Sequence, residues 1–174
     1  MTKQEVRTYI RSLKSQYSAQ DLKTMSVSVT TRLEELPQWK AAQRVLLYWS
    51  LTDEVYTHDL LHRYYEKKTL LLPVVEMDSM DMTIRPYTGP SCLAVGAYGI
   101  SQPTTPVYEG EIDLAVVPAV AVDNEGNRLG HGKGYYDRLL ERLNCPIITI
   151  VFPFQVLPSI PVEPHDRKMD FIVS

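Results

Sequence analysis

The sequence is poor in cysteine, in basic charge and in long apolar runs. Only Cys92 and Cys145 occur, outside any metal-ligand spacing, so we expect no zinc site and a reducing compartment, the cytoplasm. The 18 basic residues do not outnumber the 21 acidic ones, and the resulting net charge of −3 argues against a general nucleic-acid binder. No apolar run approaches the length of a membrane span, and no signal-peptide core is present, so no membrane partner is expected.

The length of 174 residues favours one domain, residues 1–174, with a substantial core. We expect it to be a monomer that binds small molecules. The first 15 residues are basic and amphipathic, as in a transit peptide. Glu5 and the unbroken helical pattern favour a structural helix instead.

Helical and strand patterns alternate along the chain. Apolar residues at helical spacing predict helices over 2–17, from Ser18 onward with a capping-box-like start, over 57–67 and over 134–143. Short apolar runs predict strands at 44–50, 69–75, 82–87, 114–122, 146–152 and in the closing residues FIVS; the proline in 82–87 suggests an edge strand. This alternation predicts an α/β fold with a mostly parallel sheet covered by helices, a Rossmann-like three-layer arrangement.

Residues 88–111 form a long connection that contains several glycines and prolines. Such a segment is too long for a passive turn, and we expect it to be a functional loop.

Glycine is also scarce, with 8 residues in the chain, yet Gly130, Gly132 and Gly134 fall within the run RLGHGKGYYDRLL. The run joins a buried strand to a helix, where backbone N–H groups and the helix dipole favour an anion. Arg128 and Lys133 add positive charge, so the run predicts a phosphate-binding loop. Its spacing matches neither the Walker A loop nor the dinucleotide fingerprint. The alternative is a flexible turn with incidental charges.

Asp137 follows this loop directly. An acid in the first turn of a helix stabilises the dipole, which is its simplest role. Next to a bound phosphate, however, a carboxylate is repulsive unless a cation intervenes, and Mg²⁺ binds through one or two carboxylates plus phosphate oxygens. The combination therefore suggests Mg-ATP.

The same run, preceded by DLAVVPAVAVDNEGN, resembles the signature of the 5-formyltetrahydrofolate cyclo-ligase (methenyltetrahydrofolate synthetase) family. KQEVR at 3–7, DEV at 53–55 and PHDRKMDFIV at 164–173 resemble its other motifs, so the similarity spans the chain. The resemblance implies conversion of 5-formyltetrahydrofolate to 5,10-methenyltetrahydrofolate, with ATP as co-substrate, Mg²⁺ as cofactor, and ADP and phosphate as products.

The resemblance also implies roles for individual residues. Lys133 and Arg128 would be catalytic, and Asp137 and Asp166 would bind the metal. The residues expected to bind ATP are Lys3, Arg7, Arg128, Leu129, Gly130, His131, Gly132, Lys133, Gly134, Tyr135 and Tyr136. Those expected to bind the folate are Trp49, Glu54, His131, Gly132, Lys133, Gly134 and Tyr135.

Several of these residues have simpler interpretations. Lys3 and Arg7 share a helix face and could belong to a solvated basic surface. Trp49 could be a core residue, and Glu54 an ordinary loop acid. Tyr135 and Tyr136 point about 100° apart on a helix, so one of them could be core. Asp170 competes with Asp166 for the metal.

The motif HDLLH at 58–62 is close to the HExxH zinc motif. Aspartate replaces the catalytic base, no third ligand is evident, and Leu60 and Leu61 indicate a packing helix, so we do not predict a metalloprotease.

Two functions of other classes remain open on the sequence alone. One is a small-molecule kinase on the same scaffold, and the other is a non-enzymatic folate-binding protein. The presence of Lys133, Asp137 and Glu54 argues against the second.

Overall fold

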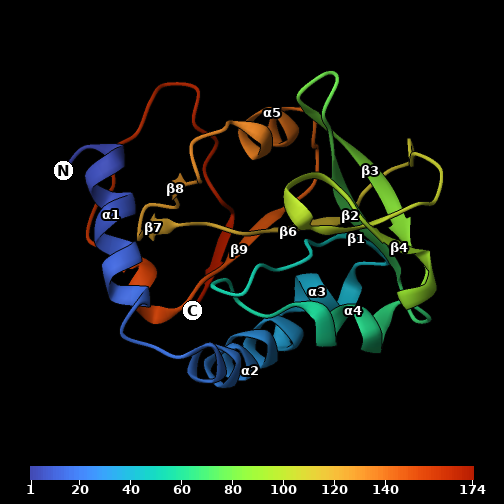
Figure 1. Ribbon diagram of the computed structural model, residues 1–174, viewed down its shortest axis with the longest axis horizontal. Helices are drawn as coiled ribbons and strands as arrows, with labels where there is room; N and C mark the ends of the chain where they lie inside the picture. The colour runs from blue at the N-terminus through green and yellow to red at the C-terminus, as the bar shows by residue number, and fades with distance from the viewer.

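The computed structural model describes residues 1–174 and is built on a six-stranded sheet (Figure 1). Its strands follow the order β11-β9-β6-β1-β2-β3, and neighbours pair in parallel except β3, which runs antiparallel to β2 at one edge. The strands are β1 (Arg44–Leu46), β2 (Thr69–Glu76), β3 (Asp81–Tyr87), β6 (Leu114–Val117), β9 (Ile147–Ile150) and β11 (Phe171–Val173). The expected edge position of the strand predicted at 82–87, which is β3, is confirmed.

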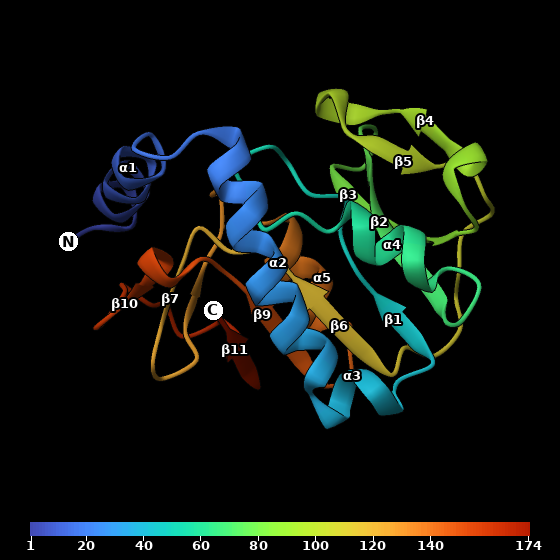
Figure 2. The ribbon, with the colours of Figure 1, turned by 90° about the horizontal axis from the view of Figure 1, so that it is seen from below.

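Helices cover both faces of this sheet (Figures 1 and 2). One face carries α2, α3 and α4, the other face carries α5, and α1 lies to one side. The helices are α1 (Lys3–Lys14), α2 (Ala19–Glu35), α3 (Pro37–Ala41), α4 (His58–Tyr64) and α5 (Tyr135–Glu141). The predicted α/β class and three-layer arrangement are confirmed.

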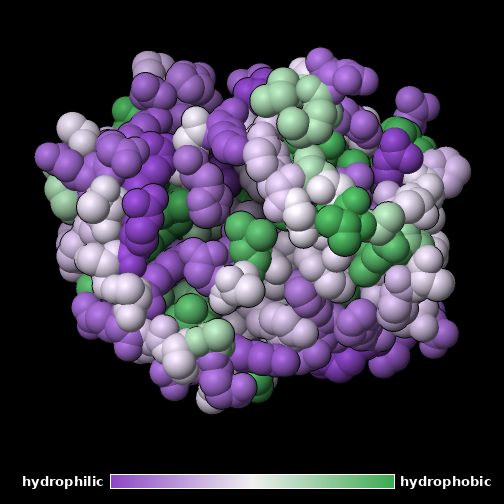
Figure 3. Space-filling model, viewed as in Figure 1, coloured by the Kyte–Doolittle hydropathy of each residue, from purple (hydrophilic) through white to green (hydrophobic).

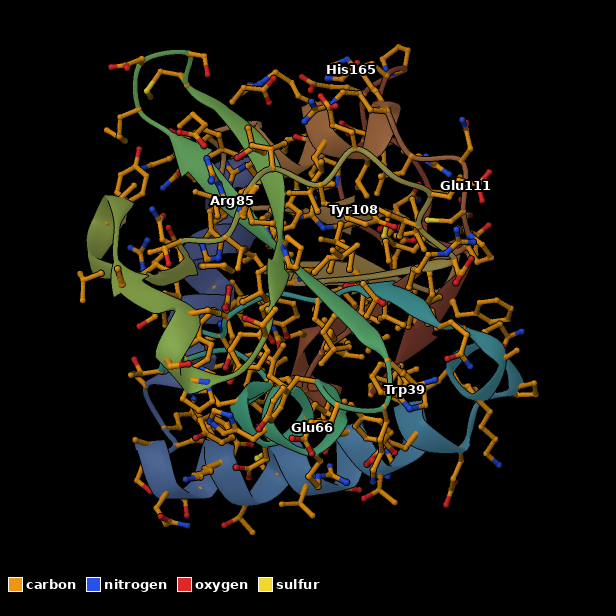
Figure 4. The ribbon with its side chains drawn as sticks, turned by 90° about the vertical axis from the view of Figure 1, so that its right-hand side faces the viewer. Trp39, Glu66, Arg85, Tyr108, Glu111 and His165 are labelled. Atoms are coloured by element: carbon orange, nitrogen blue, oxygen red, sulfur yellow. The ribbon has the colours of Figure 1, made fainter.

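The core has two sides because alternate residues of a strand point to opposite faces. In β1, Val45 packs with the apolar residues of α2, α3 and α4, whereas Leu46 packs with those of α5. Trp39 of α3 is fully buried in the first of these cores, on the face of the sheet that α2, α3 and α4 cover (Figure 4). Burial on both faces explains why these strands read as continuous apolar runs.

The predicted capping box at the start of α2 is confirmed. The Ser18 hydroxyl accepts from the Asp21 backbone N–H at 3.0 Å, and the Asp21 carboxylate accepts from the Ser18 N–H at 2.9 Å. Two otherwise unpaired backbone donors are thereby satisfied. The expected helix over 2–17 is shorter, since α1 ends at Lys14 and Tyr17 stacks on Phe154 instead, with ring centroids 5.1 Å apart.

Two predicted strands are interrupted. The run 44–50 is a strand only to Leu46, and the run 114–122 divides at Pro118, which has no N–H for a sheet. After the division, β7 (Ala121–Asp123) joins a second sheet with β8 (Arg128–Leu129) and β10 (Val156–Leu157). This small sheet packs against Val6 and Ile10 of α1.

Residues 88–111 contain a hairpin where a loop was expected. Short 3₁₀ turns at Pro90–Cys92 and Ala97–Gly99 flank β4 (Leu93–Val95) and precede β5 (Ser101–Pro103). A third 3₁₀ turn spans Pro153–Gln155. Figure 2 shows the β4–β5 hairpin beside β3 and next to α4. No helix has both the length and the apolar character required to cross a bilayer.

Candidate active site

A pocket of about 540 Å³ lies beyond the carboxyl ends of β1, β2 and β6, where ligands bind in parallel α/β sheets. In Figure 3 hydrophilic residues gather over α1 and around the hollow beside it, and hydrophobic atoms lie deeper. All the candidate residues predicted from the sequence line this pocket: Lys3, Arg7, Trp49, Glu54, Arg128, Leu129, Gly130, His131, Gly132, Lys133, Gly134, Tyr135, Tyr136, Asp137 and Asp166.

Arg128 supplies a buried positive charge. Its side chain is 4% exposed, and its Nε donates to the carbonyl oxygen of Pro118 at 2.7 Å, at the break between β6 and β7. Its guanidinium lies 5.2 Å from the ring centroid of Tyr136, and the carboxylate of Asp137 is 3.4 Å away. Burial lowers the pKa of Arg128, and the negative field of Asp137 partly opposes this. A buried positive charge that is only partly neutralised by a carboxylate favours the binding of an anion.

The glycine loop is held against α1. Arg7 Nε donates to the carbonyl oxygen of Gly130 at 2.9 Å, so the residue predicted to bind phosphate contacts the predicted phosphate loop. Gly132 has φ +100°, and a Cβ there would lie 3.2 Å from the Arg7 guanidinium. Gly132 is therefore required both by its backbone conformation and by the close approach of Arg7.

Lys133 points toward the β4–β5 hairpin. Its Nζ lies 3.6 Å from the ring centroid of Tyr98, and the Tyr98 hydroxyl lies 2.9 Å from that of Tyr135. The hydrogen bond with Tyr135, together with Lys133, lowers the pKa of Tyr98. Tyr98 has φ +58°, a conformation that is uncommon for a residue with a side chain. The structure thus places Tyr98 at the pocket, where no sequence motif indicated it.

Both tyrosines that follow the loop line the pocket. Tyr135 contacts the hairpin through its hydroxyl, and Tyr136 lies under Arg128. Burial raises the pKa of Tyr136 well above its ordinary value, so this phenol stays neutral. Neither tyrosine is only a core residue.

Glu54 and Trp49 occupy the other half of the pocket. The Glu54 side chain is 7% exposed, and its Oε2 accepts from the Leu51 N–H at 2.9 Å. Its Oε1 lies 3.4 Å from Nε2 of His131, which belongs to the glycine loop. Trp49 is half-buried and lines the same region.

Lys3 and Asp166 meet at the entrance formed by α1 and the segment before β11. Lys3 Nζ lies 2.8 Å from Glu163 and 3.0 Å from Asp166. Burial alone would lower the pKa of Lys3, but the hydrogen bonds with these two carboxylates raise it. Asp170 lies outside the pocket and accepts from the Ile147 N–H at 2.7 Å, so the geometry separates it from Asp166.

The carboxylates of Asp137 and Asp166 fit the oxygen ligands that Mg²⁺ prefers. Both line the pocket that contains the glycine loop, and Asp137 is 44% exposed, with its Oδ1 turned toward Arg128. An acid so accessible, beside a loop with cationic side chains, is a suitable ligand for a hydrated divalent ion.

The apolar wall was also missed from the sequence. Pro73 and Val75 of β2, Met82 of β3 and Ile100 of the hairpin line the pocket opposite the charged loop. The only sequence signal for this wall was the length of the 88–111 segment. An apolar residue within a strand pattern can equally well belong to the core, so the pattern does not identify it as a pocket residue. The remaining lining residues beyond those predicted are Tyr48, Leu51, Ala97, Gln102, Pro118 and Glu163.

The fold and the pocket define an α/β enzyme that places a cationic glycine loop next to an apolar cleft for a small molecule. Comparison with known proteins gives the family. The whole chain, residues 1–174, matches the 5-formyltetrahydrofolate cyclo-ligase family, and the protein belongs to it.

Individual relatives agree with this assignment. The chain is 28% identical over 185 residues to 5-formyltetrahydrofolate cyclo-ligase of Mus musculus, covering 97% of this chain and 89% of the relative. A probable 5-formyltetrahydrofolate cyclo-ligase of Schizosaccharomyces pombe is 28% identical over 194 residues, covering 100% and 95%. The solved structure of Aquifex aeolicus 5,10-methenyltetrahydrofolate synthetase matches with a TM-score of 0.88 and 35% identity, covering 99% of this chain and 89% of that one.

Proposed function

We propose that this enzyme uses ATP to close 5-formyltetrahydrofolate into 5,10-methenyltetrahydrofolate, releasing ADP and phosphate. The observation that carries the proposal is one pocket with two unlike halves. Arg7, Arg128 and Lys133 surround the glycine loop in one half. Glu54 and Trp49, with the apolar wall, form the other. Two ligands that react with each other require such adjoining halves.

The chemistry explains why a phosphate site adjoins a folate site. A formamide carbon is a poor electrophile because nitrogen donates into the carbonyl, and the carbonyl oxygen is a poor leaving group. In our proposal the formyl oxygen attacks the γ-phosphorus of ATP, and the bond to ADP breaks. N10 of the same folate then attacks the formyl carbon and loses its proton, the ring closes, and phosphate leaves with the former formyl oxygen.

The protein mainly positions the ligands and neutralises charge, as in phosphoryl transfer generally. Arg128 and Lys133 would stabilise the charge on the transferred phosphoryl group, while Arg7, Lys3 and the loop from Leu129 to Tyr136 would hold ATP. Glu54 would accept from pterin N–H groups through its Oε1, with Trp49 against the ring and residues 131–135 between the two ligands. We assign no general base.

Asp137 and Asp166 would hold the magnesium ion, which when bound supplies positive charge that neutralises the phosphates. The ion would also require Lys3 to release Asp166 in part, since Asp166 is now paired with it. A cytoplasmic location, suggested by two unpaired cysteines, and a monomeric state remain predictions.

The test is to mix the protein with 5-formyltetrahydrofolate and Mg-ATP, and to follow methenyltetrahydrofolate by absorbance and ADP by a coupled assay. We expect product only when both substrates are present, with one ADP formed per methenyl product. ADP formation with phosphate transferred to another acceptor, and no methenyl product, would show a kinase instead. Folate binding without turnover would show a non-enzymatic binding protein.

A further inference from the structure

The two histidines of HDLLH lie behind the pocket, facing Trp49. The ring of His58 lies flat on the Trp49 ring, with centroids 3.7 Å apart and planes 20° apart. Nε2 of His58 is 3.0 Å from the backbone carbonyl oxygen of Ser50, and because a carbonyl can only accept, this nitrogen carries the hydrogen. His58 therefore contacts both the side chain of Trp49 and the backbone of the next residue.

The segment that carries Trp49 and Glu54 lacks regular secondary structure, because β1 ends at Leu46 and α4 begins at His58. Side chains at the C-terminal end of this segment hold it in place through hydrogen bonds and ring contacts. The Thr57 hydroxyl donates to the carbonyl oxygen of Tyr48 at 2.6 Å and accepts from the Ser50 N–H at 3.2 Å. His58 adds the one stacked aromatic contact with Trp49, whereas the rings of His62 and Tyr87 lie farther from it, at 6.3 and 6.4 Å.

His58 is in turn in contact with Tyr56, which packs against α2. The Tyr56 ring lies 4.5 Å from the His58 ring, and Nζ of Lys23 on α2 lies 4.5 Å from the Tyr56 ring centroid. The Tyr56 N–H also donates to the Ser26 hydroxyl of α2 at 2.8 Å. The imidazole thus contacts the rings of both Trp49 and Tyr56, and Tyr56 in turn contacts Lys23 and Ser26 of α2.

We propose that His58 is a positioning residue that holds Trp49 and the Ser50 backbone in place for the folate. This inference rests on the proposed function, because it takes Trp49 as part of the folate half. The imidazole contributes two separable features, a flat ring that stacks on the indole and an N–H that binds the Ser50 carbonyl. An aromatic pair and a neutral hydrogen bond each favour one fixed arrangement of the groups that they join.

Three substitutions separate these features. His58→Phe keeps a flat ring and loses the donor, His58→Gln keeps a donor and loses the ring, and His58→Ala loses both. We expect the KM for 5-formyltetrahydrofolate to rise about tenfold in the alanine variant and less in the other two. The KM for ATP and the turnover at saturating folate should stay within about twofold of the wild type.

His62→Gln is the matched control. His62 lies one turn further along α4, its ring meets Trp49 only edge-on at 6.3 Å, and its Nδ1 is 2.8 Å from the Tyr87 hydroxyl. The residue does not line the pocket. We expect His62→Gln to leave the folate KM unchanged even where it lowers the melting temperature.

Tryptophan fluorescence reports the stack without depending on activity. Burial lowers the pKa of His58, against the effect of its hydrogen bond to Ser50. The charged and titratable groups around it are Lys23 on α2, Tyr56 in the segment before α4, and Asp59 and His62 on α4. A protonated imidazole in contact with an indole quenches its emission, so wild-type emission should fall on acidification, and that fall should be largely lost in His58→Phe. Trp39, the other tryptophan, lies against Tyr64 and Lys68.

The outcomes discriminate between the two proposals. An inactive wild-type protein would overturn the proposed function, whereas an active wild type with an unchanged folate KM in all three His58 variants would overturn the role of His58 alone. A joint change of both KM values and turnover, in proportion to lost stability, would also overturn it. Identical acid quenching in the wild type and in His58→Phe would show that the ring does not lie on Trp49.

Discussion

At the scale of single residues, Arg128 is the side chain that most constrains the chemistry. It is buried, its Nε is fixed by the Pro118 carbonyl, and its nearest carboxylate, Asp137, is 3.4 Å away. A guanidinium keeps its proton even when burial lowers its pKa. The pocket therefore presents a permanent positive charge whose hydrogen-bonding capacity is only partly used.

Asp137 has three roles to distinguish, and one substitution separates metal binding from the other two. Asp137→Asn keeps an oxygen but loses charge, so as a metal ligand it should raise the magnesium concentration for half-maximal activity and lower turnover even at saturating ATP. As a helix-dipole acid alone it should cost a few tenths to about 1 kcal/mol of stability and little activity. As only a partner of Arg128 it should leave the magnesium dependence unchanged. The measurement is a magnesium titration of activity alongside a thermal melt.

Asp170→Asn provides the control for this experiment. Asp170 lies outside the pocket and accepts from the backbone of Ile147. The substitution should lower the melting temperature while the magnesium titration overlays that of the wild type. A normal magnesium dependence in Asp137→Asn would leave the metal without its main proposed ligand.

At the scale of elements, the glycine loop depends on α1, although about 120 residues separate them in the sequence. The contact between Arg7 and Gly130 links the first helix to the loop after β8 and places both at the same pocket. Because α5 has only 7 residues, we expect the cationic side chains and loop amides to contribute more to anion binding than the dipole of this helix.

Two glycines of similar conformation test this dependence. Gly132→Ala places a methyl group 3.2 Å from the flexible Arg7 guanidinium at φ +100°, so we expect at least a tenfold loss of kcat/KM for ATP with a modest effect on folding. Gly126→Ala, at φ +86°, meets the backbone oxygen of Met169 at 2.8 Å. This rigid contact should cost about 2 kcal/mol of stability or more and leave the kinetics of the folded enzyme unchanged. Equal kinetics for Gly132→Ala and the wild type would mean that the run is a turn only.

At the scale of the whole molecule, the pocket is assembled from distant segments. The cationic half comes from α1 and residues 128–134, and the apolar half from β2, β3 and the β4–β5 hairpin. Because each ligand would contact several of these segments at once, its binding should raise the stability of the folded state as a whole.

Ligand-induced thermal shifts should separate the two halves. A ligand at one hundred times its Kd stabilises the native state by about 2.7 kcal/mol. We expect 5-formyltetrahydrofolate to raise the melting temperature of the wild type and of Arg7→Ala, but much less that of Glu54→Gln. Mg-ATP should show the reverse pattern. The same loss of both shifts in one variant would contradict the division of the pocket.

The sequence by itself determined the fold class, the alternation of elements and the set of candidate site residues. Those features are local: apolar periodicity predicts helices and strands, and a glycine loop with its charges can be recognised from neighbouring residues. The candidate residues meet in one pocket because loops after parallel strands share one edge of the sheet. Their individual roles stay predictions until the variants are measured.

Only the tertiary structure decided where β1 ends, how the run 114–122 divides into β6 and β7, and that residues 88–111 form a hairpin. It also placed Tyr98 against Lys133 and His58 against Trp49. In each case the deciding interaction is local packing or a contact between segments that no periodic pattern specifies. An apolar run reads the same whether it pairs in one sheet or passes from one sheet to another, and an aromatic residue reads the same in a core or at a pocket wall.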